Sequence, residues 1–278
     1  MPESRHWDIF KCADVEIPSR HLGLSLDEDF CFEEFADRVA ELVEKHVNIN
    51  RLLELTKPVA TAVVPISAGR HIYKREPSFP IAVACDPAFN FVYEANIRYL
   101  HHLGEVTYFS SVGRHFLPDA GFVYLPGGLS GVISCCFIGK QQMLQSIRRY
   151  VESGGKLLAE CGGMMYLCDE IRDKNGYVYP MAGVLHQSAT MENMKLRLGY
   201  RTLLYNETRL KGHEFHYSRL VEQQNPLPSC AVAYTAKGVE TDTPLYHYKN
   251  VWAGYTHLYW ADPVGNEWFT KFVIDGNI

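Results

Sequence analysis

Features that mark several large classes of protein are missing from this 278-residue chain. No apolar run approaches the roughly 18 residues of a membrane-spanning helix. The first residues, MPESRHWDIFK, lack the apolar segment of a secretory signal. Lysine and arginine form no large cluster, and the formal net charge is -5, which argues against a nucleic-acid-binding surface. We therefore expect a cytoplasmic protein that binds neither nucleic acid nor a membrane.

The eight cysteines form no CxxC pair and no regular framework. In a reducing compartment such cysteines are mostly buried as small apolar side chains and are not paired in disulfides. His213 and His216, in GHEFHYS, stand three residues apart and faintly resemble a metal pair. Two ligands with no cysteine nearby are a weak indication of a metal site. We expect this chain to hold no metal and no cofactor.

The sequence divides into two unequal parts. Apolar residues recur at three- and four-residue spacing between 26 and 55, which predicts an amphipathic helix followed by a shorter one at NRLLELT. Residues 57–80 contain four prolines and one glycine and have the composition of a linker, with one short strand possible at TAVV. We expect a helical extension over 1–56, a linker over 57–80 and the main domain over 81–278.

After Pro80, strand and helix patterns alternate. Apolar runs at IAVAC (81–85), GFVYLP (121–126) and KLLAE (156–160) are typical of buried parallel strands, and EVTYFSS (105–111) alternates as a strand. Helical patterns cover 92–103 and 139–153, and a further helix begins at GGMMYLCDEI. Beyond residue 180 the strand candidates are LRLGYRTLLYN, CAVAYT and NVWAGYTHLYW. This order predicts an α/β fold with an open, mostly parallel sheet flanked by helices.

The stretch LLAECGGMM (157–165) places Cys161 where a predicted parallel strand ends and a helix begins. Active sites in open α/β sheets gather at this edge. On a strand–turn–helix elbow a nucleophile is exposed above the sheet, and the following N–H, that of Gly162, can bind an oxyanion. A helix N-terminus also lowers the pKa of a thiol. The spacing alone favours equally a buried thiol beside a glycine turn.

Two other stretches complete a candidate site. Gly127-Gly128 ends the strand before the Cys161 strand, so the N–H of Gly128 could face that of Gly162 as a second oxyanion donor; a plain turn is the alternative. A cysteine nucleophile needs a base, usually a histidine distant in sequence. His257, in GYTHLYW, is the candidate, and a hydrogen-bonded core histidine is the alternative. No acid stands two residues further on, because that position is Tyr259.

Taken in order, these motifs resemble a known family, the glutamine amidotransferase domain of cobyrinic acid a,c-diamide synthases. The stretches that carry the resemblance are AVACDPAFNFVYEANIRYL, YLPGG, LLAECGGMMYL, GHEFHYS and GYTHLYW. AFNFVY together with GHEFHYS is similar to the cobyrinate branch or its relative acting on nickel sirohydrochlorin. IPSRHLGL (17–24) and the following helix resemble the last part of the ATP-dependent synthetase domain that precedes the amidotransferase domain in those enzymes.

The resemblance implies a class I glutamine amidotransferase fold and chemistry. Cys161 would attack the side-chain amide of glutamine and form a thioester, His257 would protonate the leaving ammonia, and Gly128 and Gly162 would donate to the oxyanion. The histidine of this family often works without a neighbouring glutamate, so Tyr259 is compatible. Family members often continue the Gly-Gly turn with an aromatic residue, a proline and a glutamate, whereas this chain has Leu129-Ser130-Gly131.

The chain lacks the P-loop, GxxxxGK[ST], with which the full enzymes bind ATP. The resemblance therefore implies a synthetase domain or subunit elsewhere, holding ATP and Mg2+ and activating a carboxylate of the tetrapyrrole (corrin) substrate. Residues 1–56 would be the remnant of that domain, with L-glutamine the substrate of this chain. A homodimer through the Phe32, Phe35 and Val39 face stays open. Two other functions also stay open: a cysteine hydrolase of another amide, and a catalytically weak subunit that binds a separate synthetase.

Overall fold

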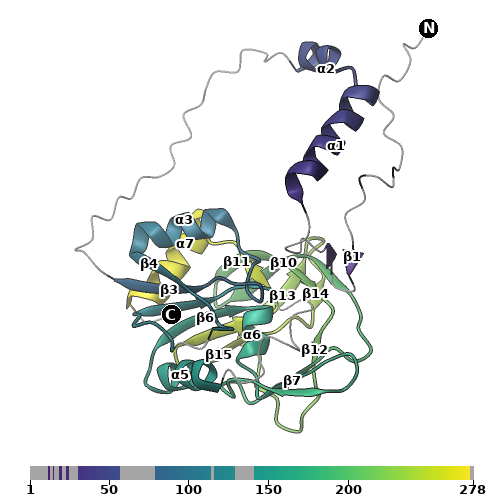
Figure 1. The fold of residues 1–278 in the computed structure, drawn as a ribbon. Coiled ribbons are helices and arrows are strands. Elements are labelled where there is room, and N and C mark those ends of the chain that lie inside the picture. The colour runs from purple at the N-terminus through teal and green to yellow at the C-terminus, as the bar shows by residue number, and fades with distance from the viewer. Residues whose placement is uncertain are drawn as a thin grey trace. The chain divides into compact units, whose positions relative to one another are not determined.

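A computed structural model describes residues 12, 15, 19–20, 23–24, 31–56, 79–113, 116–128 and 141–275 (Figure 1). The chain forms two compact units, 1–71 and 72–278. The expected linker, apart from its last two residues, and the Leu129-Ser130-Gly131 turn lie outside the described residues. Among the described residues, no helix is both long and apolar enough to cross a membrane.

The first unit contains the helical extension that the sequence predicts. Its elements are β1 (Ser19–Arg20), β2 (Gly23–Leu24), α1 (Phe32–His46) and α2 (Ile49–Leu55). Acidic residues in the first turn of α1 and basic residues in its last turn match the helix dipole. The side chain of Asn48 caps α2 by accepting the N–H of Arg51 at 3.0 Å. No side chain of α1 is buried, and Phe32 is 65% exposed.

The second unit is built on a six-stranded sheet in the order β15–β16–β6–β5–β3–β4. These strands are β3 (Pro80–Ala84), β4 (Glu105–Phe109), β5 (Phe122–Leu125), β6 (Lys156–Glu160), β15 (Leu245–Tyr248) and β16 (Val251–Gly254). All neighbours pair in parallel except β15 with β16. The continuous apolar runs of β5 and β6 are buried because helices cover both faces of the sheet. This confirms the predicted α/β class.

Helices flank this sheet on both sides (Figure 1). They are α3 (Glu94–Leu103), α5 (Gln141–Glu152), α6 (Gly162–Tyr166) and α7 (Pro263–Thr270), which runs into η2 (Lys271–Asp275). The helix predicted to begin at Gly162 is shorter than its pattern suggests. After Tyr166 the backbone turns to bond with a later segment, as when Asp169 N–H donates to Gln187 O at 2.8 Å. The chain then enters β7, so the stretch DEI is not helical.

Two smaller sheets complete the unit. The five-stranded antiparallel sheet has the order β14–β13–β10–β11–β17, and the four-stranded sheet has the order β12–β9–β7–β8. Their strands are β7 (Glu170–Arg172), β8 (Val178–Pro180), β9 (Ser188–Thr190), β10 (Arg197–Tyr205), β11 (Thr208–His216), β12 (Arg219–Leu220), β13 (Val232–Thr235), β14 (Glu240–Thr241) and β17 (His257–Leu258). NVWAGYTHLYW, expected as one strand, divides into β16 in the main sheet and β17 in the antiparallel sheet. His257 therefore lies where two sheets meet.

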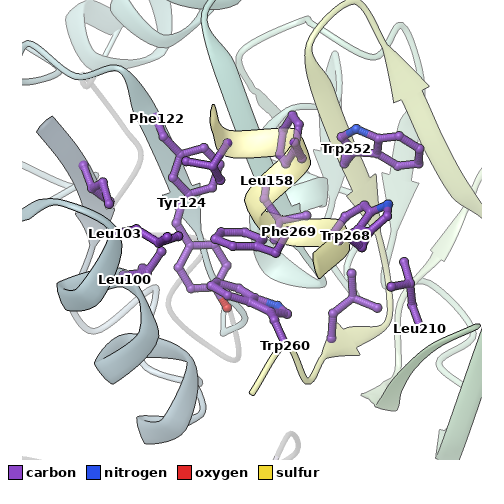
Figure 2. Close-up of a cluster of buried hydrophobic side chains, with 14 of the residues drawn as sticks. Leu100, Leu103, Phe122, Tyr124, Leu158, Leu210, Trp252, Trp260, Trp268 and Phe269 are labelled. Atoms are coloured by element: carbon purple, nitrogen blue, oxygen red, sulfur yellow. The ribbon is translucent and has the colours of Figure 1, made fainter. Parts of the chain in front are cut away.

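A buried aromatic cluster packs α3 and α7 against the main sheet (Figure 2). The ring of Trp260 stacks on Phe269 at 4.0 Å between centroids and meets the edge of Tyr124 at 5.0 Å. Burial of each such side chain contributes about 1.5–3 kcal/mol to stability. Because Trp260 follows His257 by three residues, the core of the domain anchors the strand that carries the candidate base.

Candidate active site

Cys161 sits on the turn between β6 and α6 in a sparsely populated backbone conformation, with φ 49° and ψ -104°. A positive φ strains a residue that has a Cβ, so neighbouring groups must hold it. The N–H of Cys161 donates to Gly254 O at 2.7 Å, and Gly163 N–H donates to Pro126 O at 3.2 Å. A Cβ on Gly163 would stand 2.1 Å from Leu125 O. This is the geometry of a nucleophile elbow.

The thiol of Cys161 is buried and has two backbone donors. Burial raises its pKa to about 12, while hydrogen bonds from the N–H groups of Gly162 and Gly128 lower it by less. The nearby carboxyls of Glu160 and Glu214 also raise the pKa. The expectation that a helix N-terminus lowers this pKa overall is therefore wrong. Helix α6 has only five residues, and desolvation of the thiolate outweighs its N-terminal N–H groups.

The Gly127-Gly128 loop lies between the thiol and the candidate base. The N–H of Gly128 donates to the Cys161 thiol. A Cβ on its neighbour Gly127 would stand 2.0 Å from Cε1 of His257. Gly128 has φ 143°, and a Cβ there would stand 2.2 Å from Ala88 O. The Gly127-Gly128 loop thus lies beside both Cys161 and His257, while Gly162 follows Cys161 directly.

The imidazole of His257 is buried, and among the described residues it forms no ion pair with a carboxylate. Its ring lies 4.4 Å from that of Phe91 and 5.1 Å from that of His213, between centroids. Its Nδ1 is buried and has no hydrogen-bond partner among the described residues. Burial lowers the pKa of His257 to about 3, with His213 and His216 acting in the same direction and Glu214 against it. The imidazole is therefore neutral and able to accept a proton.

Two acids, one near His257 in sequence and one on the neighbouring strand, are engaged elsewhere. Asp262 caps α7 by accepting the N–H of Gly265 at 2.7 Å. Glu214, on the neighbouring strand, forms an ion pair with Arg201 at 2.7 Å. Because side chains alternate along a strand, Glu214 lies on the opposite face of β11 from His213, the residue that stacks on His257.

Two buried polar side chains fix the segment that follows His257. Oε1 of Glu160 accepts the N–H of Leu258 at 3.0 Å, and Oε2 accepts the hydroxyl of Tyr124 at 2.7 Å. Asn96, on α3, donates to Leu258 O at 2.8 Å and accepts the N–H of Trp260 at 3.0 Å. Through these contacts Glu160 and Asn96 hold the backbone after His257 in place. Burial raises the pKa of Glu160 to about 8.

Sequence reasoning missed the aromatic residues that surround His257. It treated His213 only as half of a weak metal pair, yet His213 and His216 lie on opposite faces of β11. His216 instead stacks on Tyr255 at 3.8 Å, whereas His213 bonds through Nδ1 to the hydroxyl of Tyr93 at 2.6 Å. No group of three or more metal-ligating side chains converges within the described part of the chain. The alternation of β11 was the signal that could have separated the two histidines.

A family model and the relatives found by sequence comparison point to the same family of proteins. The model of the CobB/CobQ-like glutamine amidotransferase domain matches residues 80–264. The cobyrinate a,c-diamide synthase of Dehalococcoides mccartyi is 33% identical over 276 residues, which cover 91% of this chain and 58% of that protein. The hydrogenobyrinate a,c-diamide synthase of Stutzerimonas stutzeri is 32% identical over 273 residues, which cover 95% of this chain and 60% of that protein. This chain thus spans about three fifths of the length of these relatives. Because the family model covers more than half of its residues, the chain belongs to the family of CobB/CobQ-like glutamine amidotransferase domains.

Proposed function

We propose that this chain is the glutaminase part of an ATP-dependent a,c-diamide synthase in cobalamin biosynthesis, with a cobyrinate-type corrin as the acceptor. The family and the activities for which its relatives are named support this proposal. One observation carries it. In the Gly127-Gly128 loop, the N–H of Gly128 donates to the thiol of Cys161, and Gly127 lies against the imidazole of His257. Nucleophile, oxyanion donors and base therefore share one small volume.

The proposed chemistry follows from this arrangement. In the resting site, burial favours the thiol of Cys161 and the neutral imidazole of His257. As the sulfur attacks the amide carbon of bound glutamine, the imidazole takes the thiol proton. The N–H groups of Gly128 and Gly162 hold the negative charge that develops on the amide oxygen, each contributing about 3 kcal/mol in the transition state. The imidazolium then gives its proton to the leaving nitrogen, which departs as ammonia.

Release of glutamate reverses the proton path. The neutral imidazole of His257 takes a proton from water as the water oxygen attacks the thioester, and the same two N–H groups hold the second oxyanion. Collapse of the intermediate breaks the C–S bond, and the proton returns to the sulfur of Cys161. The sum is one glutamine and one water giving one glutamate and one ammonia, with the thiol restored.

The fate of the ammonia is the part of the proposal that needs a partner. This chain has no P-loop, and its relatives are longer by about two fifths of their length. We propose that a synthetase domain or subunit holds ATP and Mg2+, activates a corrin carboxylate as a phosphate ester, and receives ammonia from the Cys161 site. The nitrogen then displaces phosphate and forms the amide.

A glutamine-mimicking alkylator tests the proposal without requiring fast turnover in an isolated chain. The reagent is expected to modify Cys161 once per chain, and excess glutamine is expected to protect it. The variant Cys85→Ser, which changes an exposed free thiol, serves as the control and is expected to be labelled like the wild type. Absence of labelling at Cys161, together with no glutamate production, would support a catalytically weak subunit. Equal protection by unrelated amides would support a general cysteine hydrolase.

A further inference from the structure

The side chains of His213 and His257 face each other across two strands. His213, on β11, pairs in register with His257, on β17. Directly opposed residues of an antiparallel pair project from the same face of the sheet. Accordingly, the two imidazoles stack with 5.1 Å between centroids and an interplanar angle of 27°. The flat face of one histidine therefore supports the flat face of the other.

Packing on three sides fixes the ring of His257. Gly127 approaches its Cε1 edge, Phe91 lies 4.4 Å away between ring centroids, and His213 stacks on its face. Where a base is oriented by an acid, a hydrogen bond to the second ring nitrogen sets its rotation. The Nδ1 of His257 has no such bond among the described residues. Its orientation therefore rests on its neighbours.

His213 needs a support of its own because it is only half-buried. Tyr93 supplies it: the phenol oxygen lies 2.6 Å from Nδ1 of His213. Burial raises the pKa of Tyr93 to about 12 and lowers the pKa of His213, so the hydrogen bond joins a neutral phenol and a neutral imidazole. Tyr93 is itself held, because it forms the N-cap of α3 and its ring meets the edge of Tyr259 at 5.5 Å. A chain of contacts thus runs from α3 to the candidate base.

We propose that Tyr93 and His213 are positioning residues for His257, which together perform the task that an acid performs in a cysteine–histidine–acid site. Tyr93 fixes His213 by a hydrogen bond, and His213 fixes the imidazole of His257 by stacking. This inference rests on the proposed glutaminase function, because it assigns a role in that reaction. In this assignment the effect of each residue is exerted through its contact chain to His257.

The test is a double-mutant cycle on the full 278-residue chain, with glutamine hydrolysis as the readout. Tyr93→Phe removes one oxygen and keeps the ring, and His213→Phe keeps a flat ring but cannot form the hydrogen bond with Tyr93. Each change is expected to lower kcat about tenfold or more with KM within about twofold, because a misplaced base slows the chemical step and leaves glutamine binding intact. The double variant is expected to be no slower than the slower single variant.

Tyr200→Phe is the matched control. Tyr200 lies opposite His213 on β10 and is 75% exposed, so loss of its hydroxyl is expected to leave kcat within twofold. Melting temperatures recorded beside the kinetics separate misplacement of His257 from loss of folded protein. If His213→Phe does not fold, Tyr93→Phe alone decides the matter.

Three outcomes would overturn the inference. The first is an unchanged kcat in Tyr93→Phe. The second is a double variant whose loss in kcat equals the product of the two single losses. The third is a change in KM with no change in kcat. The failure of the proposed function is a different result: in that case the wild type itself would hydrolyse glutamine no faster than Cys161→Ala. The wild-type and Cys161→Ala rates are therefore measured in the same series.

Discussion

The imidazole of His257 lies so close to Gly127 that a Cβ on that glycine would stand 2.0 Å from Cε1 of the ring. Real Cβ atoms do not make contacts of this length, so position 127 has no room for a side chain while His257 keeps its place. The glycine is needed for this close approach, since only Gly128 of the pair has a positive φ. The relationship links the loop after β5 directly to the candidate base.

Gly127→Ala is expected to push the imidazole of His257 out of position. Phe91 and His213 block the other sides of the ring, so the added methyl group cannot be accommodated by a small rotation. We expect kcat for glutamine hydrolysis to fall by about a hundredfold, the scale of a displacement of about 1 Å in an active site. Steady-state kinetics beside circular dichroism measure this effect.

Gly238→Ala is the control for the strain of substituting a glycine. A Cβ at Gly238 meets nothing within 4 Å, but its φ of 76° disfavours alanine. This variant is expected to lose about 1 kcal/mol of stability and to keep its kcat. If Gly127→Ala keeps kcat within threefold of the wild type, the close contact with His257 has no catalytic importance.

The reactivity of Cys161 is expected to rise with pH and to show no plateau in the neutral range. Burial raises the pKa of the thiol, and the neighbouring imidazole is neutral because its own pKa is lowered. Below the thiol pKa the thiolate fraction rises tenfold per pH unit, so alkylation by iodoacetamide is expected to accelerate about tenfold per unit from pH 6 to 9. Quantifying the peptide that contains Cys161 by mass spectrometry gives the rate. A plateau reached below pH 8 would mean a resting thiolate–imidazolium pair.

Glu160 is expected to make stability fall as pH rises. Its pKa is about 8 in the folded protein against an ordinary value of 4.5, so the folded state holds this proton over a range in which the unfolded state has lost it. The stabilising contribution is complete below about pH 4.5 and is lost as pH rises through about 8. Each pH unit within that window costs about 1.4 kcal/mol.

Glu160→Gln removes this titration and keeps an oxygen that can accept the N–H of Leu258. The unfolding free energy is measured in urea melts at several pH values. The value for the variant minus the value for the wild type is expected to increase between pH 5 and pH 8. Glu152→Gln is the control, because Glu152 has its pKa lowered by Lys249 and Tyr248 at the surface. If the difference in unfolding free energy between Glu160→Gln and the wild type does not change with pH, Glu160 is not protonated in the folded protein.

Asn96 is expected to be important for stability because it satisfies two buried backbone groups of the segment after His257. Asn96→Leu keeps the shape of the side chain but leaves Leu258 O and the Trp260 N–H without their partner. Each unsatisfied buried group costs about 1–3 kcal/mol, so a loss of about 2–5 kcal/mol is expected in chemical denaturation. The exposed Asn175→Ala is expected to change stability by less than about 0.5 kcal/mol. A loss below 1 kcal/mol in Asn96→Leu would show that water replaces the amide.

The sequence could predict the parts of the site that depend on local pattern. The apolar run of β6 ends at Glu160 as expected, and the glycines after Cys161 and Pro126 marked the two loops that meet. The end of each strand and the glycine loop after it can be predicted because they depend on residues that are adjacent in the sequence. The class of the sheet followed from the alternation of strands and helices for the same reason.

The parts that could not be predicted depend on register and burial. Whether His213 faces His257 is decided by the pairing of β11 with β17, and a shift of one residue would turn it to the other face. The direction of the thiol pKa depends on how deeply Cys161 is buried, which the motif ECGG does not encode. The division of NVWAGYTHLYW between two sheets likewise depends on partners distant in sequence, Leu157 to Glu160 for β16 and Gly212 and His213 for β17.

The rate of glutamate formation in Cys161→Ala, set beside the wild type and Cys85→Ser, tests the central claim most directly. The full chain is incubated with glutamine, and glutamate and ammonia are both quantified. The account predicts equal amounts of the two products from the wild type and from Cys85→Ser, and none above the uncatalysed background from Cys161→Ala. Glutamate formation by Cys161→Ala at the wild-type rate would contradict it.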